Sequence, residues 1–153
     1  MEIATFGAGC FWGIESAFSR VTGVLGTSVG FMGGRTENPS YDAVCVGNTG
    51  HAEVVQARFD PEIASFDNLL DLFWTLHDPT LSTRNDMSRA SQYRSVIFFH
   101  SLEQEGVALQ SRKIVQLLKG NPIATEIVPA GPYFLAEEYH QRFEAKQRRT
   151  KVR

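Results

Sequence analysis

The sequence has only two cysteines and no long apolar run, and each scarcity excludes a class of protein. Two cysteines, Cys10 and Cys45, are too few for a disulfide-stabilised scaffold. They form no Cys-x-x-Cys pair and the four histidines are scattered, so we expect neither a zinc site nor a thioredoxin-type redox pair. No apolar run approaches the roughly 20 residues that a membrane-spanning helix needs.

Charge and targeting signals are also sparse. A formal net charge of -2 argues against a general nucleic-acid surface. The basic residues that end the chain are interpreted as a helix end whose cations suit its negative pole, followed by a solvated tail. The N-terminus shows no basic segment followed by an apolar stretch, so no signal peptide is visible. We expect a cytoplasmic monomer that binds neither nucleic acid nor membranes.

The composition that remains is that of a globular protein, and its elements can be placed from hydrophobic periodicity. With 153 residues, 42% of them hydrophobic and 21% charged, we expect one domain, residues 1–153, with one core. Strands are predicted at 2–7, 24–31, 53–59, 94–100 and 124–129. Helices are predicted at 11–21, 66–77, 101–119 and 135–148. Two long loops, 35–52 and 79–92, fit a functional role.

The order of these elements predicts the fold class. The chain reads strand, helix, strand, strand, helix, strand, helix, strand, helix. Its first six elements match the split βαβ, ferredoxin-like arrangement. We therefore predict an α+β two-layer sandwich with a ferredoxin-like βαββαβ core, an additional C-terminal helix and long loops, with the helices mainly on one side of the sheet.

The cysteine at the start of the first helix is the candidate nucleophile. Cys10 follows a strand and a Gly-Ala-Gly turn, and the first turn of a helix offers unpaired N–H groups and the positive end of the helix dipole. Both favour a thiolate and lower the pKa of the thiol. The alternative is a buried cysteine that acts as a small apolar residue. Position alone leaves these two readings open.

Two aromatic residues and one carboxylate extend this candidate site. Phe11 lies on the apolar stripe of the helix, whereas Trp12 lies off it and offers a flat apolar wall beside the thiol. Glu53 begins a strand and, by period two, lies on its apolar face, where burial would raise its pKa and let it deliver a proton near pH 7. Core packing of Phe11 and a solvent-exposed Glu53 are the alternatives.

Loop residues give weaker signals. Tyr41 and Tyr93 lie in or beside the long loops, and a phenol can donate a hydrogen bond to a developing oxyanion. Asp86 is also a candidate, although Asn85-Asp86 reads equally as an ordinary turn. His51 is interpreted as a turn residue rather than a base. The glycine-rich stretch 26–34 lacks the Lys-Ser/Thr of a phosphate loop, so no nucleotide site is predicted.

Ordered motifs covering nearly the whole chain resemble those of the peptide methionine sulfoxide reductase A family. GCFWG at 9–13 matches the signature of that family, and GFMGG at 30–34 resembles its second glycine motif. Further matches follow in the order and spacing of the family: NPSY at 38–41, VC at 44–45, TGHAE at 49–53, HDPT at 77–80, QYRS at 92–95, TEI at 125–127 and FLAEEYHQ at 134–141.

The resemblance implies a role for each candidate. Cys10 would attack the sulfur of methionine S-sulfoxide, free or in proteins, and become a sulfenic acid as methionine departs, a repair of oxidative damage. Glu53 would supply the proton that lets the oxygen leave. Tyr41 and Tyr93 would hold the oxygen. Phe11 and Trp12 would enclose the methyl group. No metal or organic cofactor is implied.

Two departures from the family pattern bear on these roles. Asn85-Asp86 stands two residues farther from Gln92 than in the family, and without a gap Ser88 falls where the aspartate belongs. Many members of the family carry resolving cysteines in a glycine-rich C-terminal tail, and this sequence has no cysteine after Cys45. The resemblance therefore implies direct recycling by an external thiol: thioredoxin, glutaredoxin or a small thiol such as dithiothreitol. Recycling through Cys45 is the alternative and needs Cα atoms within about 7 Å.

Two other classes of function compete with this reading. A cysteine hydrolase needs a base beside the thiol, for which His51 is the best candidate. A binding domain without catalysis is the other, because a fold alone does not fix function.

Overall fold

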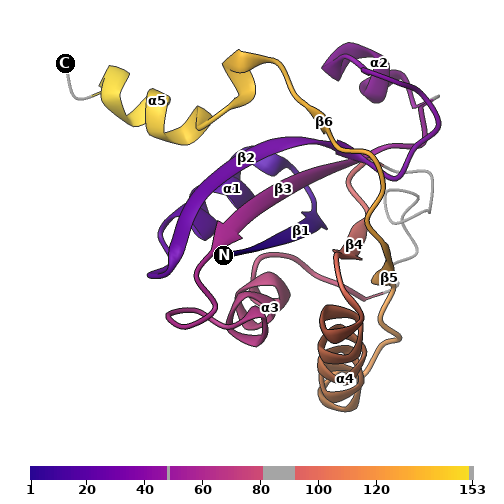
Figure 1. Cartoon of the computed structure of the whole chain (residues 1–153). Coiled ribbons are helices and arrows are strands. Elements are labelled where there is room, and N and C mark those ends of the chain that lie inside the picture. The colour runs from indigo at the N-terminus through magenta and orange to yellow at the C-terminus, as the bar shows by residue number, and fades with distance from the viewer. Residues whose placement is uncertain (48, 81–91, 152–153) are drawn as a thin grey trace.

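A six-stranded sheet organises the protein (Figure 1). The computed structural model describes residues 1–47, 49–80 and 92–151. The strands stand in the order β5-β4-β1-β3-β2-β6, and neighbours are antiparallel except for the parallel pair β4 and β5. Their bounds are β1 (Glu2–Ala8), β2 (Val24–Met32), β3 (Ala52–Phe59), β4 (Ser95–Phe99), β5 (Glu126–Pro129) and β6 (Phe134–Leu135).

The helices connect these strands and are capped by local side chains. They are α1 (Phe11–Ser19), α2 (Tyr41–Val46), α3 (Phe66–Thr75), α4 (Leu102–Leu118), the 3-10 turn η2 (Glu138–His140) and α5 (Phe143–Lys151). Ser65 and Asn68 exchange hydrogen bonds in a capping box that starts α3. Ser101 caps α4 by accepting from the backbone of Gln104. Within the described part of the chain, every helix is too short or too polar to span a bilayer.

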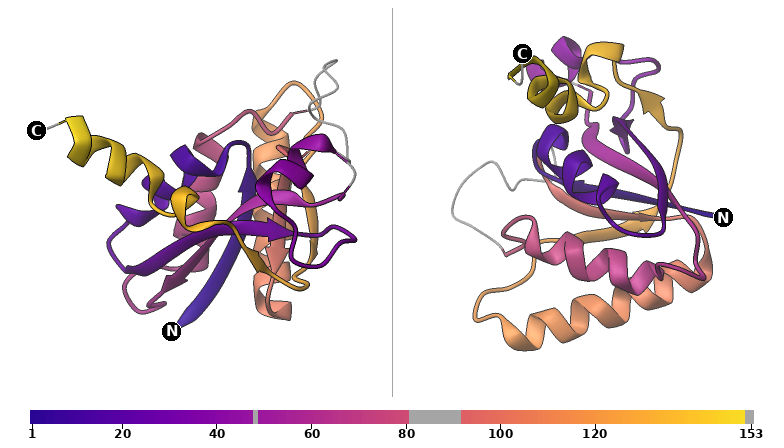
Figure 2. Two further views of the ribbon diagram at one scale, coloured as in Figure 1. Left: turned by 90° about the horizontal axis from the view of Figure 1, so that it is seen from above. Right: turned by 90° about the vertical axis from the view of Figure 1, so that its left-hand side faces the viewer.

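The main core lies between one face of the sheet and three helices. Side chains alternate along each strand, so one face of β1 and β3 turns toward α1 and α3, while α4 packs outside α3 and against β4 and β5 (Figure 2). At its centre the ring of Phe6 packs against those of Phe18, Phe66 and Phe73, with centroids 5.1, 5.8 and 5.3 Å away. The opposite face is apolar too, and the segment between β5 and β6 covers it with Ala130 and Tyr133.

This arrangement confirms the predicted α+β class and the placement of the main helices on one side of the sheet. Two local predictions were wrong. The loop predicted at 35–52 contains the short helix α2, which Ser40 caps. The helix predicted at 135–148 begins only at Phe143.

The late start of that last helix has a physical cause. Residues 134 and 135 pair with β2, and the backbone N–H of Ala136 donates to the carbonyl of Val29. The side chain of Gln141 then bonds both the N–H and the carbonyl of Val29. Pairing with the free edge of β2 satisfies backbone groups that a helix would otherwise satisfy, so tertiary context outweighs helix propensity here.

Candidate active site

The thiol of Cys10 sits where β1 passes into α1. Gly9 adopts a φ of 104°, which an L side chain rarely tolerates, and this turn places Cys10 at the N-cap of α1. The backbone N–H groups of Trp12 and Gly13 lie near enough to the thiol to lower its pKa. Cys10 is exposed, so the alternative of a buried structural cysteine does not hold.

The charge balance around this thiol differs from the prediction made from its helix position. Partial burial is the largest influence and raises the pKa of Cys10, and the nearby carboxylate of Glu53 raises it further. The backbone N–H groups of Trp12 and Gly13 act in the opposite direction but do not prevail. The expectation of a lowered thiol pKa was therefore wrong, because desolvation and a like charge outweigh the helix N-terminus.

Glu53 is the charged residue with the largest influence on the Cys10 thiol. It starts β3 on the helix-facing side and is 1% exposed, as its alternation with apolar residues predicted. Its Oε1 accepts from the backbone N–H of Phe11 at 3.3 Å, and its Oε2 accepts from Nε2 of Gln92 at 2.6 Å. Burial raises the pKa of Glu53 despite these two donors. The acid is thus bonded to the residue that directly follows the candidate nucleophile.

The two predicted tyrosines meet at the same place. Tyr41 begins α2 and Tyr93 follows Gln92, and each phenol influences the pKa of the other. Burial is the main cause that raises the pKa of both phenols, so both keep their protons at neutral pH. Two neutral O–H groups beside a buried acid can donate to an oxygen atom that gains negative charge.

An aromatic wall flanks the thiol. Phe11 is 1% exposed and packs against Phe31, so it belongs to the core as well as to the site. The indole of Trp12 stacks on Phe143 with ring centroids 3.9 Å apart. The ring of Tyr41 lies 6.2 Å from that of Phe11 and 6.4 Å from that of Trp12. These rings form a flat apolar surface of the kind that suits a small methyl group.

Two residues that support this site were not predicted as site residues. Gln92 bridges the site through its bond to Glu53. His140 is fully buried, accepts the indole N–H of Trp12 on Nδ1 at 2.9 Å and packs on Tyr41 with ring centroids 4.3 Å apart. Burial lowers the pKa of His140, which keeps the ring neutral and able to accept. Both residues lie in motifs that the family resemblance includes, and that was the one signal for them.

The other predicted candidates are either held away from the thiol or lie outside the described residues. His51 is buried, accepts from the backbone N–H of Gly34 and bonds the carbonyl of Thr36, so its ring is engaged by a turn and not by the thiol. Asp86 and Ser88 lie outside the described residues. Among the residues that are described, no group of histidine, cysteine, aspartate or glutamate side chains is arranged to hold a metal ion.

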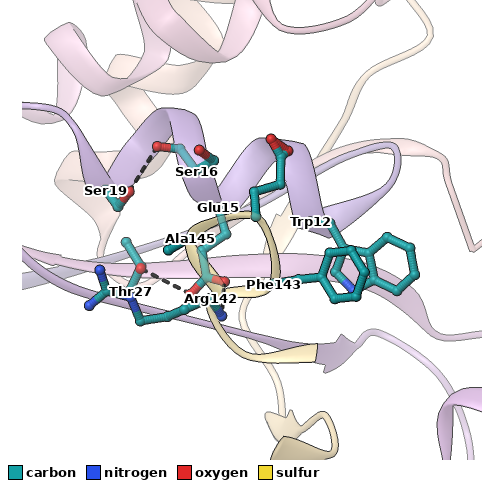
Figure 3. Close-up of a pocket in the computed structure, with 9 residues that line it drawn as sticks. Trp12, Glu15, Ser16, Ser19, Thr27, Arg142, Phe143 and Ala145 are labelled. Carbon is teal, nitrogen blue, oxygen red and sulfur yellow. Dashed lines mark hydrogen bonds between the residues drawn. The ribbon is translucent and has the colours of Figure 1, made fainter. Parts of the chain in front are cut away.

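A separate small pocket lies on the far side of Trp12, between α1 and the start of α5 (Figure 3). Its lining includes Glu15, Thr27 and Arg142 but neither Cys10 nor Glu53. Trp12 therefore contributes to this pocket as well as to the aromatic wall.

Together these features define a class of enzyme. An exposed thiol near a buried carboxylic acid and two phenols fits the needs of a thiol-dependent oxidoreductase. A cysteine hydrolase requires a histidine base on the thiol, and the one predicted for that role is held elsewhere.

Comparison with known proteins identifies the family. The family model described as peptide methionine sulfoxide reductase matches residues 2–153. Peptide methionine sulfoxide reductase MsrA of Methanothermobacter thermautotrophicus is 51% identical over 152 residues, which cover 98% of this chain and 90% of that protein. The chain belongs to the peptide methionine sulfoxide reductase family, and it is a peptide-methionine (S)-S-oxide reductase that reduces methionine sulfoxide in proteins.

Solved structures agree with this assignment. Mxr1 from Saccharomyces cerevisiae in its reduced form superposes with a TM-score of 0.87 at 33% identity and covers 96% of this chain and 86% of its own. Mxr1 in complex with Trx2 superposes with a TM-score of 0.66 at 27% identity, covering 91% of this chain and 83% of its own.

Proposed function

We propose that Cys10 is the nucleophile of this reductase. Its sulfur attacks the sulfoxide sulfur, the oxygen passes from the substrate to Cys10, and methionine leaves. The thiol proton ends on the transferred oxygen, so that thiol plus sulfoxide give sulfenic acid plus thioether. The observation that supports this role most directly is the hydrogen bond from the N–H of Phe11 to Glu53, which fixes an acid beside the first turn of the thiol's helix.

Glu53 is the proton carrier in this proposal. Burial raises the pKa of Glu53, so its carboxyl holds a proton more readily than an exposed glutamate does. Removing its negative charge by protonation also removes its repulsion of a thiolate at Cys10. A single proton on Glu53 thus favours both the attacking anion and the departure of the oxygen.

The remaining predicted residues bind the substrate. The hydroxyl groups of Tyr41 and Tyr93 donate hydrogen bonds to the sulfoxide oxygen, for which the two phenols lie close enough to influence each other's pKa. Phe11 and Trp12 hold the methyl group on sulfur, because both rings line the apolar wall next to the thiol.

We also propose the type of fold, the reductant and the cellular compartment. The elements β1, α1, β2, β3, α3 and β4 form a ferredoxin-like core with sheet order β4-β1-β3-β2, extended by β5 and β6. The electrons come from an external thiol, for which thioredoxin is the best candidate because Mxr1 has been solved in complex with Trx2. Free thiols at both cysteines fit a reducing cytoplasm.

Single-turnover kinetics with methionine S-sulfoxide and no reductant test the assigned roles. Wild-type enzyme is expected to form one equivalent of methionine and a sulfenic acid or its product. Cys10→Ser is expected to form none, because a serine alkoxide is not available at neutral pH. Glu53→Gln is expected to react about 10²–10⁴ times more slowly at neutral pH, with a smaller loss at lower pH where solvent supplies the proton.

Glu144→Gln is the matched control. Glu144 is a second carboxylate whose charge reaches Cys10, but it makes no hydrogen bond to Phe11. It is expected to react at nearly the wild-type rate. Equal losses in Glu53→Gln and Glu144→Gln would mean that general electrostatics, and not proton delivery, explains the effect of Glu53.

A further inference from the structure

Cys45 has no role in the reaction described so far, yet its thiol contacts the groups that carry out that reaction. It lies near the C-terminal end of α2 and is exposed. Nε2 of Gln92 donates to its sulfur at 3.4 Å, and Tyr41 lies on the same short helix as Cys45. The second thiol of the sequence is therefore part of the cluster around the proposed oxygen-binding site.

A short chain of hydrogen bonds connects the two cysteines. The nitrogen of Gln92 that donates to Cys45 also donates to Oε2 of Glu53. The other oxygen of Glu53 accepts from Phe11, the neighbour of Cys10. The phenol of Tyr93 experiences the charge of both thiols. One amide and one carboxylate thus separate the Cys45 sulfur from the first turn of α1.

The segment that carries Cys45 is short and buries few side chains. Helix α2 has six residues, and Val44 is the one that it buries. The helix ends at Gly47, whose φ of 93° allows the chain to change direction without strain. A disulfide needs the two Cα atoms within about 7 Å. Rearranging a short exposed helix loses little buried apolar area, so such an approach is inexpensive.

We propose that Cys45 is the resolving cysteine of this enzyme. This inference rests on the proposed attack by Cys10. The Cys45 sulfur attacks the sulfur of the Cys10 sulfenic acid, the S–O bond of Cys10 breaks as the S–S bond forms, and the departing oxygen leaves as water with the Cys45 proton. Cys10 is reduced from sulfenic acid to disulfide, and Cys45 is oxidised from thiol to disulfide.

The proposal changes what the external reductant does. A dithiol such as thioredoxin then attacks an intramolecular disulfide and returns both cysteines to thiols, with its own two thiols oxidised to a disulfide. Without Cys45, an external thiol must attack the sulfenic acid itself.

The test is a stoichiometric reaction of the full chain with methionine S-sulfoxide in the absence of reductant. Released methionine, remaining free thiols and the intact mass are measured for wild type and Cys45→Ser. Wild type is expected to release one equivalent of methionine and to lose both thiols, with a mass lower by two hydrogens. Cys45→Ser is expected to release the same methionine, to lose one thiol and to gain one oxygen, which dimedone traps.

Steady-state turnover supplies a second readout. In Cys45→Ser, turnover with thioredoxin is expected to fall at least about tenfold, equivalent to about 1.4 kcal/mol, relative to turnover with dithiothreitol. Cys45→Ala should behave alike and controls for any effect of the new hydroxyl. A wild-type enzyme that releases methionine but keeps a free Cys45 thiol and a dimedone-reactive Cys10 would overturn the proposal, as would a disulfide between two chains. Absence of methionine release from wild type would instead overturn the role of Cys10.

Discussion

The indole Nε1 of Trp12 donates a hydrogen bond to Nδ1 of His140 at 2.9 Å, joining residues 128 positions apart. His140 belongs to η2, which follows the edge strand β6. The C-terminal segment therefore sets the orientation of the aromatic wall beside the Cys10 thiol. In the proposed mechanism, substrate binding therefore depends on contacts that the first helix cannot make alone.

Trp12→Phe is expected to weaken both the fold and substrate binding. It keeps a ring that can stack on Phe143 but leaves the buried Nδ1 of His140 without its donor. An unsatisfied buried acceptor costs about 1–3 kcal/mol, which urea denaturation measures. Because the wall loses its fixed orientation, kcat/KM for methionine sulfoxide is expected to fall about tenfold.

Trp74→Phe provides the matched control. Its indole donates to Oγ of Ser111 at 2.8 Å, in the contact between α3 and α4 and far from the thiol in the fold. The same loss of stability is expected, with unchanged kcat/KM. A fall of kcat/KM in both variants would assign the effect to general destabilisation and would remove Trp12 from the binding surface.

The sequence predicts the meeting of Cys10 and Glu53 only in part. The sequence left open whether Cys10 is exposed or buried and whether Glu53 is buried or exposed, and the structure has an exposed thiol and a buried acid. That the two lie at the same end of neighbouring strands follows from the antiparallel register of β1 and β3. Register is a tertiary property, and the pattern of one strand does not contain it.

The C-terminal part of the site was harder to predict for a related reason. The apolar spacing of residues 135–148 favours a helix, yet bonds from Ala136 and Gln141 to Val29 hold part of it against β2. These bonds connect residues more than 100 positions apart, and local propensity contains no information about such contacts. The role of His140 follows from that docking and was missed with it.

Alkylation of Cys10 by iodoacetamide is expected to reveal its raised pKa. In a Cys45→Ser background, where Cys10 is the remaining thiol, the pH midpoint of the alkylation rate should lie above that of an ordinary cysteine. Glu53→Gln removes a nearby negative charge, so it should lower this midpoint. Part of the elevation should remain, because burial is the larger cause.

The direction of that shift decides between two explanations. If the Glu53→Gln midpoint stayed at the wild-type value, burial alone would control the thiol and the carboxylate would not be coupled to it. Glu144→Gln should produce a smaller shift in the same direction, since the charge of Glu144 has the weaker influence.

Glu15 holds the C-terminal segment against α1, and its loss is expected to loosen the site. The side chain is 2% exposed, and it accepts from Oγ1 of Thr27 at 3.0 Å and from the backbone N–H of Arg142 at 2.7 Å (Figure 3). Glu15→Ala is expected to lower the free energy of unfolding by about 2–5 kcal/mol. Since Arg142 precedes Phe143, which stacks on Trp12, KM for the sulfoxide should rise as well.

Thr27→Val separates the two hydrogen bonds of Glu15. It removes the bond from the hydroxyl and keeps the one from Arg142, so stability should fall less and KM should not change. Urea denaturation and steady-state kinetics measure the two effects. A KM that rises equally in Thr27→Val and Glu15→Ala would show that Glu15 supports the fold in general and not the position of Phe143.

His77 lies in a second polar network, whose titration should be visible in stability at acid pH. Its Nδ1 bonds the carbonyl of Phe73 at 3.0 Å, its Nε2 bonds Oγ of Ser95 at 2.7 Å, and Ser95 in turn bonds Thr125 at 2.7 Å. Burial lowers the pKa of His77 to about 4. The folded protein therefore holds this ring neutral at pH values where the unfolded chain protonates it.

Stability should consequently fall with acidification in a defined window. An unfolded histidine binds its proton near pH 6.5, whereas His77 in the folded state does so only near pH 4. Between these values the unfolded state binds more protons, so lowering the pH through this window removes up to about 3 kcal/mol of stability. His77→Gln cannot titrate, so urea denaturation should show the stability difference between wild type and variant shrinking from pH 7 to pH 4.5. A difference that stayed constant over this range would mean that His77 keeps an ordinary pKa in the folded protein, and that its network does not exclude the charged ring.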